Sequence, residues 1–449
     1  MTLKTRRQFL SLCLRGCLGA ASLSALQMRF MQSVLAAEQQ PFTDYKALVC
    51  VFLVGGNDSL NMLIPMGGDS LQFYQQARQD LAVADALPLK PLREVEDGIG
   101  LHPSMSALLP HFEQRKLAVV SAVGSLVQPT TKAEYLSGSI IKPQHLFSHN
   151  DQQDTWMRGR EPQIISRGWG AQMLELLYQQ PDFASCISLA GSNLWQSGEL
   201  ISPFGLTHGG VPELQATRRS DVRSNVLRQA TQALLTGQTH PLGSHYAQLN
   251  NNAIERSAIM RQALKLAPDF SDVFPSGNTL AAQLRKVAQI ISARDSLNVG
   301  RQVFFVRMGG FDTHGDQQRL HPILLGRVAE AMAAFQQAMD DSGNSNNVTS
   351  FTMSDFGRTL STNGDGTDHG WAGHQLVMGG AVKGGDIFGA VPQQKLGGER
   401  DVGAGRIIPE FANEQYFATL AQWFGLSAAQ CLQLFPNLKN FNQANLLFV

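Results

Sequence analysis

The sequence has no excess of charge of either sign. Its 36 lysines and arginines balance 36 aspartates and glutamates, so the formal net charge is zero, and no basic block stands out. Binding to nucleic acid depends on clustered lysine and arginine side chains that neutralise phosphates. The composition therefore argues against nucleic acid as the main partner.

Cysteine is scarce as well. The chain has five cysteines, and only Cys50, Cys186 and Cys431 lie beyond the first 37 residues, each in apolar surroundings. None of these three belongs to a C-x-x-C pair. The pattern gives neither a disulfide framework nor a thiolate zinc site. At most one bridge could form, and we expect buried free thiols.

The chain also lacks an uninterrupted apolar run long enough to cross a bilayer. Near the N-terminus, "TRRQFLSL" carries Arg6-Arg7 before an apolar stretch that Arg15 and Arg29 interrupt, and "SVLAAEQQ" offers small residues for cleavage. This pattern predicts a twin-arginine export signal over residues 1–37, which leaves no membrane span after its removal and places the protein in the periplasm. The alternative is a cytoplasmic amphipathic start.

Several catalytic signatures are missing. The sequence holds no G-x-S-x-G, no H-E-x-x-H and no Walker A loop, and "GDGTDHG" has the wrong spacing for a dinucleotide-binding motif. Serine-elbow hydrolases, zincin proteases and P-loop enzymes are therefore not indicated.

Short apolar runs alternate with helical patterns. The expected strands are 46–54, 117–124, 186–191, 302–308, 348–353 and 374–382, and the expected helices are 104–114, 280–297, 322–340 and 413–424. The runs lack strict alternation, which favours strands covered on both faces. We predict an α/β fold with a mostly parallel, doubly wound sheet, forming a single domain over residues 38–449 with a helical insertion at about 192–278.

Acidic residues follow three of the expected strands. Asp58 comes after "VFLVGGN", Asp312 and His314 after "FFVRMGGF", and Asp355 after "SFTMS". Ligands of open α/β sheets bind beyond the carboxyl ends of the strands, and carboxylates gathered there repel one another unless a cation is present. The sequence therefore predicts a metal site at this edge.

Two further histidines, His369 and His374, follow Asp355 closely in "NGDGTDHGWAGH". Oxygen and imidazole ligands without thiolates suit Zn²⁺, Mn²⁺ or iron. Each residue also has an ordinary structural interpretation. Asp58 could cap a helix, Asp355 could pair with Arg358, and Asp312 with His314 could form a turn. His369 and His374 could be structural histidines.

The segment "HLFSHNDQQDTW" is the other polar cluster. Ser148 could be a nucleophile activated by a metal ion, with His149 or Asp154 nearby. The structural alternative is a helix start, with Ser148 as the cap and Asp151 in the first turn.

Taken together, "GGND", "SHNDQQDTW", "GGFDTHGDQ", "SDFGRT", "DGTDHGWAGH" and "GRIIPEFANEQYFATLAQWFG" resemble the family of domain of unknown function 1501. The resemblance covers nearly all of the chain after residue 37. That family is similar to the alkaline phosphatase and sulfatase superfamily, whose members hold one or two metals at the carboxyl end of a mostly parallel sheet.

The resemblance implies roles for individual residues. Asp58 looks like the acid that binds one metal, Ser148 like the nucleophile, and Asp312 with His314 like the ligand pair of the other metal. Asp355 resembles the late acid, and His369 or His374 the final histidine.

The chain departs from the superfamily pattern in three places. Phe356 stands where the superfamily usually has histidine, so His369 would have to substitute as a ligand. The Asp312–His314 spacing is shorter than usual, and no C-x-P-S-R occurs, which excludes the cysteine-derived sulfatase nucleophile.

The main hypothesis is an exported hydrolase of phosphate or sulfate esters, on small molecules or polymers, that uses one or two divalent metal ions such as Zn²⁺ or Mn²⁺. The alternatives are a non-catalytic binder that keeps the metal and a scaffold partner of another exported protein.

Overall fold

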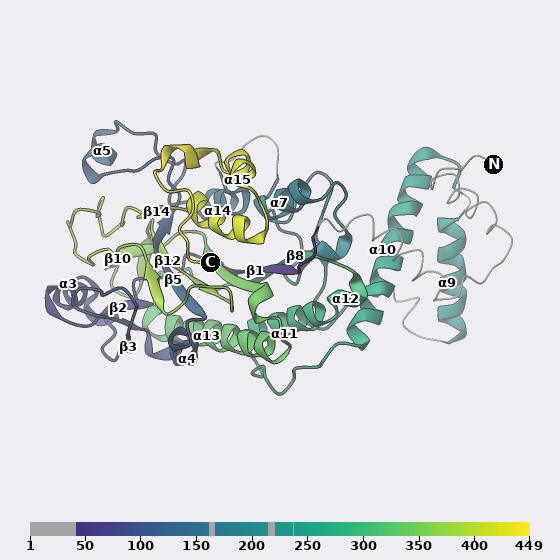
Figure 1. Ribbon diagram of the computed structural model, residues 1–449, viewed down its shortest axis with the longest axis horizontal. Coiled ribbons are helices and arrows are strands. Elements are labelled where there is room, and N and C mark those ends of the chain that lie inside the picture. The colour runs from purple at the N-terminus through teal and green to yellow at the C-terminus, as the bar shows by residue number, and fades with distance from the viewer. Residues whose placement is uncertain (1–41, 161–166, 214–220, 237) are drawn as a thin grey trace. The chain divides into compact units, whose positions relative to one another are not determined.

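The computed structural model describes residues 42–160, 167–213, 221–236 and 238–449, and the predicted export signal over 1–37 lies outside them. The chain divides into two units, residues 1–43 and Asp44–Val449. The second unit carries all the elements described below (Figure 1).

A central sheet runs through this unit in the order β13-β5-β12-β9-β1-β8-β6-β7, with β14 paired to β5. Its strands are β1 (Lys46–Leu53), β5 (Leu117–Gly124), β6 (Cys186–Ser188), β7 (Phe204–Gly205), β8 (Arg301–Met308), β9 (Val348–Ser354), β12 (Gly373–Met378), β13 (Asp386–Phe388) and β14 (Phe411–Ala412). Parallel pairing predominates, and β12 alone is antiparallel to its neighbours β5 and β9. The predicted mostly parallel sheet is confirmed.

Two smaller sheets complete the strand content of the described residues. One has the order β2-β4-β3, from Leu63–Pro65, Ile99–Leu101 and Leu87–Leu89. The other is the hairpin of β10 (Arg358–Thr362) and β11 (Thr367–His369), which carries part of the motif that follows Asp355.

Helices cover both faces of the central sheet, although not every helix packs on it. The helices of the described residues are α3 (Gly68–Arg78), α4 (Leu109–Glu113), α5 (Lys132–Ser137), α6 (His149–Arg158), α7 (Trp169–Leu177), α9 (Val222–Leu235), α10 (Pro241–Lys265), α11 (Thr279–Ser292), α12 (Arg294–Leu297), α13 (Gln317–Asp341), α14 (Asn413–Phe424) and α15 (Ala428–Leu434). Figure 1 shows α7, α14 and α15 on one side of the sheet and α11 and α13 on the other. The predicted doubly wound architecture is confirmed.

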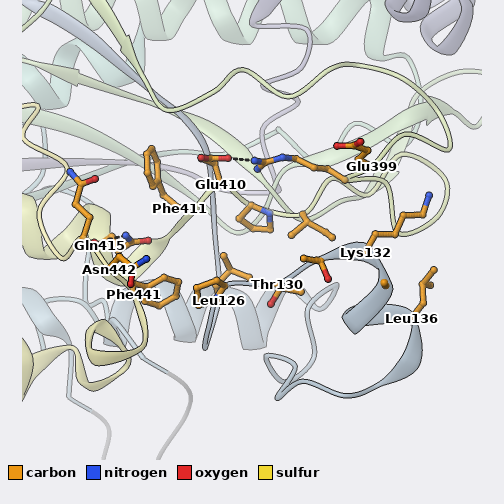
Figure 2. Close-up of a pocket in the computed structure, with 17 residues that line it drawn as sticks. Leu126, Thr130, Lys132, Leu136, Glu399, Glu410, Phe411, Gln415, Phe441 and Asn442 are labelled. Atoms are coloured by element: carbon orange, nitrogen blue, oxygen red, sulfur yellow. Dashed lines mark hydrogen bonds and ion pairs between the residues drawn. The ribbon is translucent and has the colours of Figure 1, made fainter.

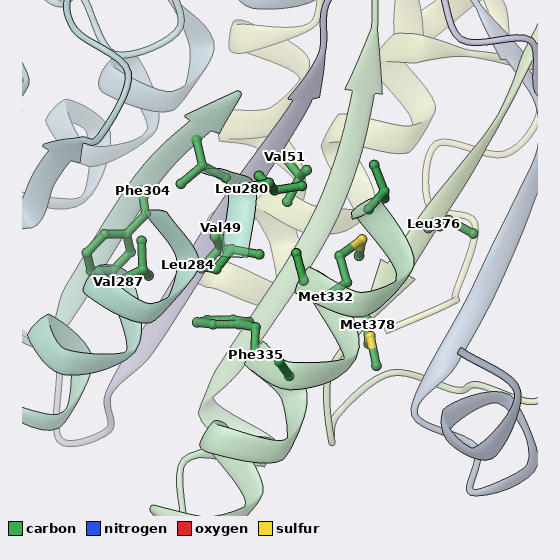
Figure 3. Packing of buried hydrophobic residues seen from close by; sticks show 14 of the residues in the cluster. Val49, Val51, Leu280, Leu284, Val287, Phe304, Met332, Phe335, Leu376 and Met378 are labelled. Atoms are coloured by element: carbon green, nitrogen blue, oxygen red, sulfur yellow. The ribbon is translucent and has the colours of Figure 1, made fainter. Parts of the chain in front are cut away.

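The larger core lies between the sheet and the helix pair α11 and α13. Leu280, Leu284 and Val287 of α11 point at Val49 and Phe304 of the sheet, and all five side chains are fully buried (Figure 3). Helices on both faces leave β1 and β8 without a solvent-facing side. This explains why the sequences of these two strands are continuous apolar runs. Burial of an apolar side chain of this size stabilises the fold by about 1.5–3 kcal/mol.

The described part of the predicted insertion, residues 192–278, contains α9 and α10, but it also contributes β7 at the edge of the central sheet. Cys50, Cys186 and Cys431 are free and buried, as expected. None of the helices in the described ranges combines the length and apolarity that crossing a bilayer requires.

Candidate metal centre

The strands β9, β1 and β8 lie side by side and parallel, so the segments that follow them meet at one edge. At Gly55, the segment after β1 lies close to the segments that follow β8 and β9. This glycine has a φ of 115°, and its backbone N–H donates to the Asp355 carboxylate at 3.2 Å. A Cβ at this position would overlap the backbone nitrogen of Asp312. Only glycine fits both the conformation and the space.

Three histidines surround Asp312 just beyond this edge. His314 lies in the same loop, His369 ends β11, and His149 begins α6. The Nε2 atoms of His314 and His369 lie 3.1 and 3.4 Å from Asp312 Oδ1, and His149 Nε2 lies 3.4 Å from Asp312 Oδ2. Ligand atoms of His149, Asp312 and His369 all fall within 4.8 Å of one another.

The other ring nitrogen of each histidine is already committed to an oxygen. His149 Nδ1 lies 2.6 Å from Asp355 Oδ2, His314 Nδ1 lies 3.1 Å from Asp368 Oδ1, and His369 Nδ1 lies 2.8 Å from the Phe147 carbonyl. Carbonyl and ionised carboxylate oxygens only accept, so each Nδ1 carries the proton. In a neutral imidazole with the proton on Nδ1, the lone pair is on Nε2, and all three Nε2 atoms point towards Asp312, which is how metal-binding histidines are oriented in proteins.

Two of these Nε2 atoms face each other at short range. The Nε2 atoms of His314 and His369 are 2.9 Å apart, and the buried Nε2 of His149 has no hydrogen-bond partner. Two nitrogen lone pairs this close repel unless a proton or a metal cation lies between them. Metal–nitrogen bonds of about 2.0–2.1 Å place tetrahedral ligands about 3.3 Å apart. The separations of 2.9 to 3.4 Å are of this size, and the ligand atoms of His149, Asp312 and His369 together lie within 4.8 Å of one another.

Protonation also favours a cation. Burial acts to raise the pKa of Asp312, but the hydrogen bond and the charge of Arg358 outweigh it and lower that pKa. Burial lowers the pKa of His369. The hydrogen bond to Asp355 raises the pKa of His149. Asp312 is thus ionised and His369 neutral at pH 7, whereas a bound cation competes with a proton for His149.

Arg358 contacts the cluster from the interior of the protein. Its side chain is fully buried and donates from Nη1 to Asp312 Oδ1 at 2.9 Å and to the Gly55 carbonyl at 3.0 Å. Its Nε donates to the carbonyl of Thr367 at 3.1 Å. One guanidinium therefore ties the segment after β1, the Asp312 loop and β11 together.

Asp58 has a different partner. Its carboxylate lies 2.6 Å from Arg78 Nη2, both side chains are fully buried, and Gln317 Nε2 donates to its other oxygen at 2.5 Å. Burial acts to raise the pKa of Asp58, but the charge of Arg78 outweighs it and lowers the pKa. Arg78 therefore balances the negative charge of Asp58, for which the sequence predicted a metal ion. Asp58 lies outside the group of three histidines.

His374 and Ser148 also have their own partners. His374 Nδ1 accepts from the backbone N–H of Ala122 at 3.1 Å, and burial lowers the His374 pKa to about 4. Its Nε2 therefore carries the proton and offers no lone pair. Ser148 precedes α6, and its hydroxyl donates to Asp151 at 2.5 Å.

The structure therefore brings together Asp312, His314 and His369 of the predicted ligands, and Asp355 joins them through His149. The sequence placed His149 only beside Ser148 and did not single out Asp368. The available signal for His149 was its place in the polar "SHNDQQDTW" motif. Nothing local to Asp368 distinguishes it from Asp365, because its role depends on the β10–β11 hairpin.

Comparison with known proteins adds a family. The profile of the family described as "Protein of unknown function (DUF1501)" matches residues 45–413. The chain belongs to this family. No curated protein matches it.

Similar solved structures include the lipoteichoic acid synthase LtaP from Listeria monocytogenes, with a TM-score of 0.35, 8% identity, and coverage of 86% of this chain and 73% of that one. Alkaline phosphatase from the Antarctic bacterium TAB5 gives a TM-score of 0.30 at 10% identity, over 88% of this chain and 99% of that one. These TM-scores are below 0.5 and the identities are low. The fold of the DUF1501 chain is therefore described by its own sheet order.

The DUF1501 chain also has a groove of about 940 Å³ near the carboxyl end of β5 (Figure 2). Leu126, Ile408, Phe411 and Phe441 supply its apolar lining, and an Arg400–Glu410 ion pair crosses it. Leu126 and Ile408 belong to a buried cluster that also contains Leu146 and Trp371. This cluster joins the groove lining to the segments that carry His149 and His369.

Proposed function

We propose that this protein is a metal-dependent ester hydrolase, with phosphate or sulfate esters as its substrate class. One observation carries the metal dependence. Three imidazoles, each with Nδ1 committed to an oxygen, direct Nε2 at the carboxylate of Asp312. The resemblance of the sequence motifs to the alkaline phosphatase and sulfatase superfamily supports the reaction class.

The proposed centre holds a single divalent ion. His149, His314, His369 and Asp312 are its ligands, and Asp355, Asp368 and the Phe147 carbonyl orient the imidazoles. Asp58 is paired with Arg78, and the Nδ1 lone pair of His374 is used by a backbone N–H. Neither residue is therefore available to a second ion, which supports one ion rather than two. The ion supplies Lewis acidity, which lowers the pKa of a nearby hydroxyl and offsets negative charge on the ester oxygens.

The site is open to solvent, so a water molecule or a substrate can reach it. The side chains of Asp312 and His314 are 45% and 44% exposed. Ser148 adjoins His149, and its hydroxyl already donates to a carboxylate that can accept its proton, Asp151. We assign Ser148 the role of nucleophile on this basis.

Metal binding is tested by elemental analysis and calorimetric titration of the full chain with Zn²⁺ or Mn²⁺. We expect one ion per chain, and a loss of affinity of at least tenfold in His149→Ala and in His369→Ala. His208→Ala removes an exposed histidine outside the cluster and serves as the matched control. Binding that survives both cluster substitutions would refute the site.

Turnover is tested separately on panels of phosphate and sulfate esters with the metal-loaded chain. Ser148→Ala should lose at least a hundredfold in kcat and keep its metal, because the nucleophile is not a ligand. An unchanged kcat would remove Ser148 from the mechanism. No turnover by the metal-loaded protein on any panel would contradict the hydrolase assignment.

A second candidate is a metal-binding protein without turnover. Phe356 favours it, because its buried ring packs against His149 and His369 with centroids 4.8 and 4.6 Å apart. An apolar ring beside the imidazoles supplies no further ligand or proton donor. Metal-dependent stabilisation without ester cleavage would support this candidate.

Export by the twin-arginine route belongs to the same proposal. Fractionation of cells expressing the chain should place it outside the cytoplasm, and Arg6→Lys with Arg7→Lys should retain it inside. Export that survives this change would contradict the assignment.

A further inference from the structure

The ligands of the proposed metal centre come from segments that are distant in the chain. Asp312 and His314 lie in the loop before α13, whereas His369 ends β11. The Nε2 atoms of His314 and His369 nevertheless lie 2.9 Å apart. Other groups of the protein must therefore hold the loop and the strand at this distance.

The side chain of Gln317, the first residue of α13, joins the loop to the strand. Its Oε1 accepts from Thr313 Oγ1 at 3.1 Å and from Thr367 Oγ1 at 2.7 Å. Thr313 stands between the two ligands of the loop, and Thr367 stands two residues before the histidine of the strand. The backbone N–H of Thr367 also donates to the Thr313 carbonyl at 3.2 Å. One amide oxygen thus connects both ligand-bearing segments through their side chains.

Asp58 determines which way this amide points. Gln317 Nε2 donates to Asp58 Oδ2 at 2.5 Å, and a carboxylate oxygen of an ionised aspartate can only accept. The nitrogen of the amide therefore faces Asp58, and its oxygen faces the two threonine hydroxyls. This orientation requires an oxygen acceptor at position 58, which a carboxylate supplies.

Arg358 extends the connection to Asp312. The hydroxyl of Thr367 has one proton, which it donates to Gln317, so its oxygen is available to accept from Arg358 Nε at 3.0 Å. The Nη1 atom of the same guanidinium donates to Asp312 Oδ1 at 2.9 Å. Every hydrogen bond along the path from Asp58 to Asp312 therefore has a definite donor and a definite acceptor.

The side chains of this path are all withdrawn from solvent. Asp58, Thr313, Gln317, Thr367 and Arg358 are each at most 1% exposed. Apolar side chains of similar volume would fill such a space at a lower desolvation cost, whereas a buried hydrogen-bonded network holds its members in one arrangement. A network at this place, between two ligand-bearing segments, fixes the geometry of the site.

We propose that Gln317 is a positioning residue of the metal centre, which acts through Thr313 and Thr367 to hold the imidazoles of His314 and His369 at metal-binding distance. The inference rests on the proposed metal-dependent function. Gln317 does not touch the ion, and Asp58 contributes by orienting the Gln317 amide. Partners that orient metal ligands typically change metal affinity by about 10–100-fold when they are removed.

Threonine-to-valine substitution tests the proposal, because valine keeps the shape of threonine and lacks the hydroxyl. The double variant Thr313→Val and Thr367→Val leaves every proposed metal ligand in place. In calorimetric titration of the full chain with Zn²⁺, we expect its affinity to be weaker by roughly tenfold or more. The double variant Thr313→Ser and Thr367→Ser keeps both hydroxyls and should bind Zn²⁺ as tightly as the wild type.

Thr349→Val is the matched control. Thr349 is fully buried in β9, and its hydroxyl has no hydrogen-bond partner among the described residues. This variant should bind Zn²⁺ like the wild type. Circular dichroism of each variant establishes that it is folded. If the double valine variant does not fold, Thr313→Val alone removes one of the two hydrogen bonds and should show a smaller loss of affinity.

Unchanged Zn²⁺ affinity in the folded valine variant would overturn the proposal. An equal loss in the serine variant would also overturn it, because sensitivity to any change of shape would then explain both results. Either outcome leaves the metal centre itself in place. A wild-type chain that binds no Zn²⁺ would instead remove the centre together with the positioning role.

Discussion

At the residue scale, the pairing of Asp58 with Arg78 gives this predicted metal ligand a different partner. A carboxylate without solvent exposure at the end of β1 needs a positive charge, and the sequence suggested a metal ion. Arg78 lies twenty positions further along the chain, at the end of α3, and nothing local links it to Asp58. Only the folded structure shows that a guanidinium supplies the charge.

This pair makes a prediction about stability. Arg78→Ala should lower the free energy of unfolding by about 3–5 kcal/mol, because it leaves a buried carboxylate without a partner. Denaturant unfolding measures the loss. The double substitution Asp58→Asn and Arg78→Gln should recover part of it and bind metal with unchanged affinity. Loss of metal in the double variant would show that Asp58 is a ligand after all.

Glu414 predicts a dependence of stability on pH. Burial raises its pKa to about 8, although hydrogen bonds from Asn437 oppose the shift. The folded state therefore binds this proton more tightly than the unfolded chain, in which the pKa of Glu414 is near its ordinary value of 4.5. Its contribution to stability is complete below pH 4.5 and is lost as the pH rises towards 8.

Glu414→Gln should remove this contribution to the pH dependence, since the amide stays neutral at every pH. Thermal unfolding of both proteins between pH 5 and 8.5 provides the comparison, and the wild type should lose stability relative to the variant as the pH rises. Parallel curves across this range would show that Glu414 is already ionised in the folded protein.

At the element scale, the apolar runs and helical patterns predicted most elements closely. The strand 117–124 and the helix 413–424 have the predicted bounds. The helix predicted from Pro322 instead begins at Gln317, because Pro322 lies early enough in α13 for the helix to tolerate it. The extra turn matters for the site, since it places Gln317 against Asp58.

The sequence did not predict that β12 runs antiparallel to its neighbours. Its apolar residues predict another buried strand but do not indicate its direction. A parallel connection needs a long crossover, whereas the β10–β11 hairpin leads the chain into β12 at the same edge of the sheet where β9 ended. Strand β12 therefore starts beside the site and runs away from it. This reversal places His374 within the sheet against Ala122, where its lone pair is already used.

The N-terminus of α11 makes a prediction for a single element. Asn278 is buried, and its side-chain oxygen accepts from the backbone N–H groups of Leu280 and Ala281 while its amide donates to the Arg327 carbonyl. Asn278→Ala should lower the free energy of unfolding by about 1–2 kcal/mol. Asn278→Asp keeps the cap and loses only the bond to Arg327, so denaturant unfolding should place it between the two.

At the scale of the whole molecule, the general location of the site followed from the sequence, because parallel strands deliver their following segments to one edge. Asp312, His314 and His369 were found in this way. His149 was not assigned as a ligand, since α6 reaches the cluster from the connection after β5, which carries no strand–glycine–aspartate signal. The grouping of these side chains is thus a property of the assembled fold.

The central claim is that three imidazoles and one carboxylate hold a metal ion. X-ray absorption at the zinc edge of the loaded protein tests it most directly. We predict a nitrogen and oxygen shell at about 2.0–2.1 Å with scattering from three imidazole rings, reduced to two rings in His314→Ala. A sulfur shell at about 2.3 Å, or a spectrum of hydrated zinc without imidazole scattering, would contradict the account.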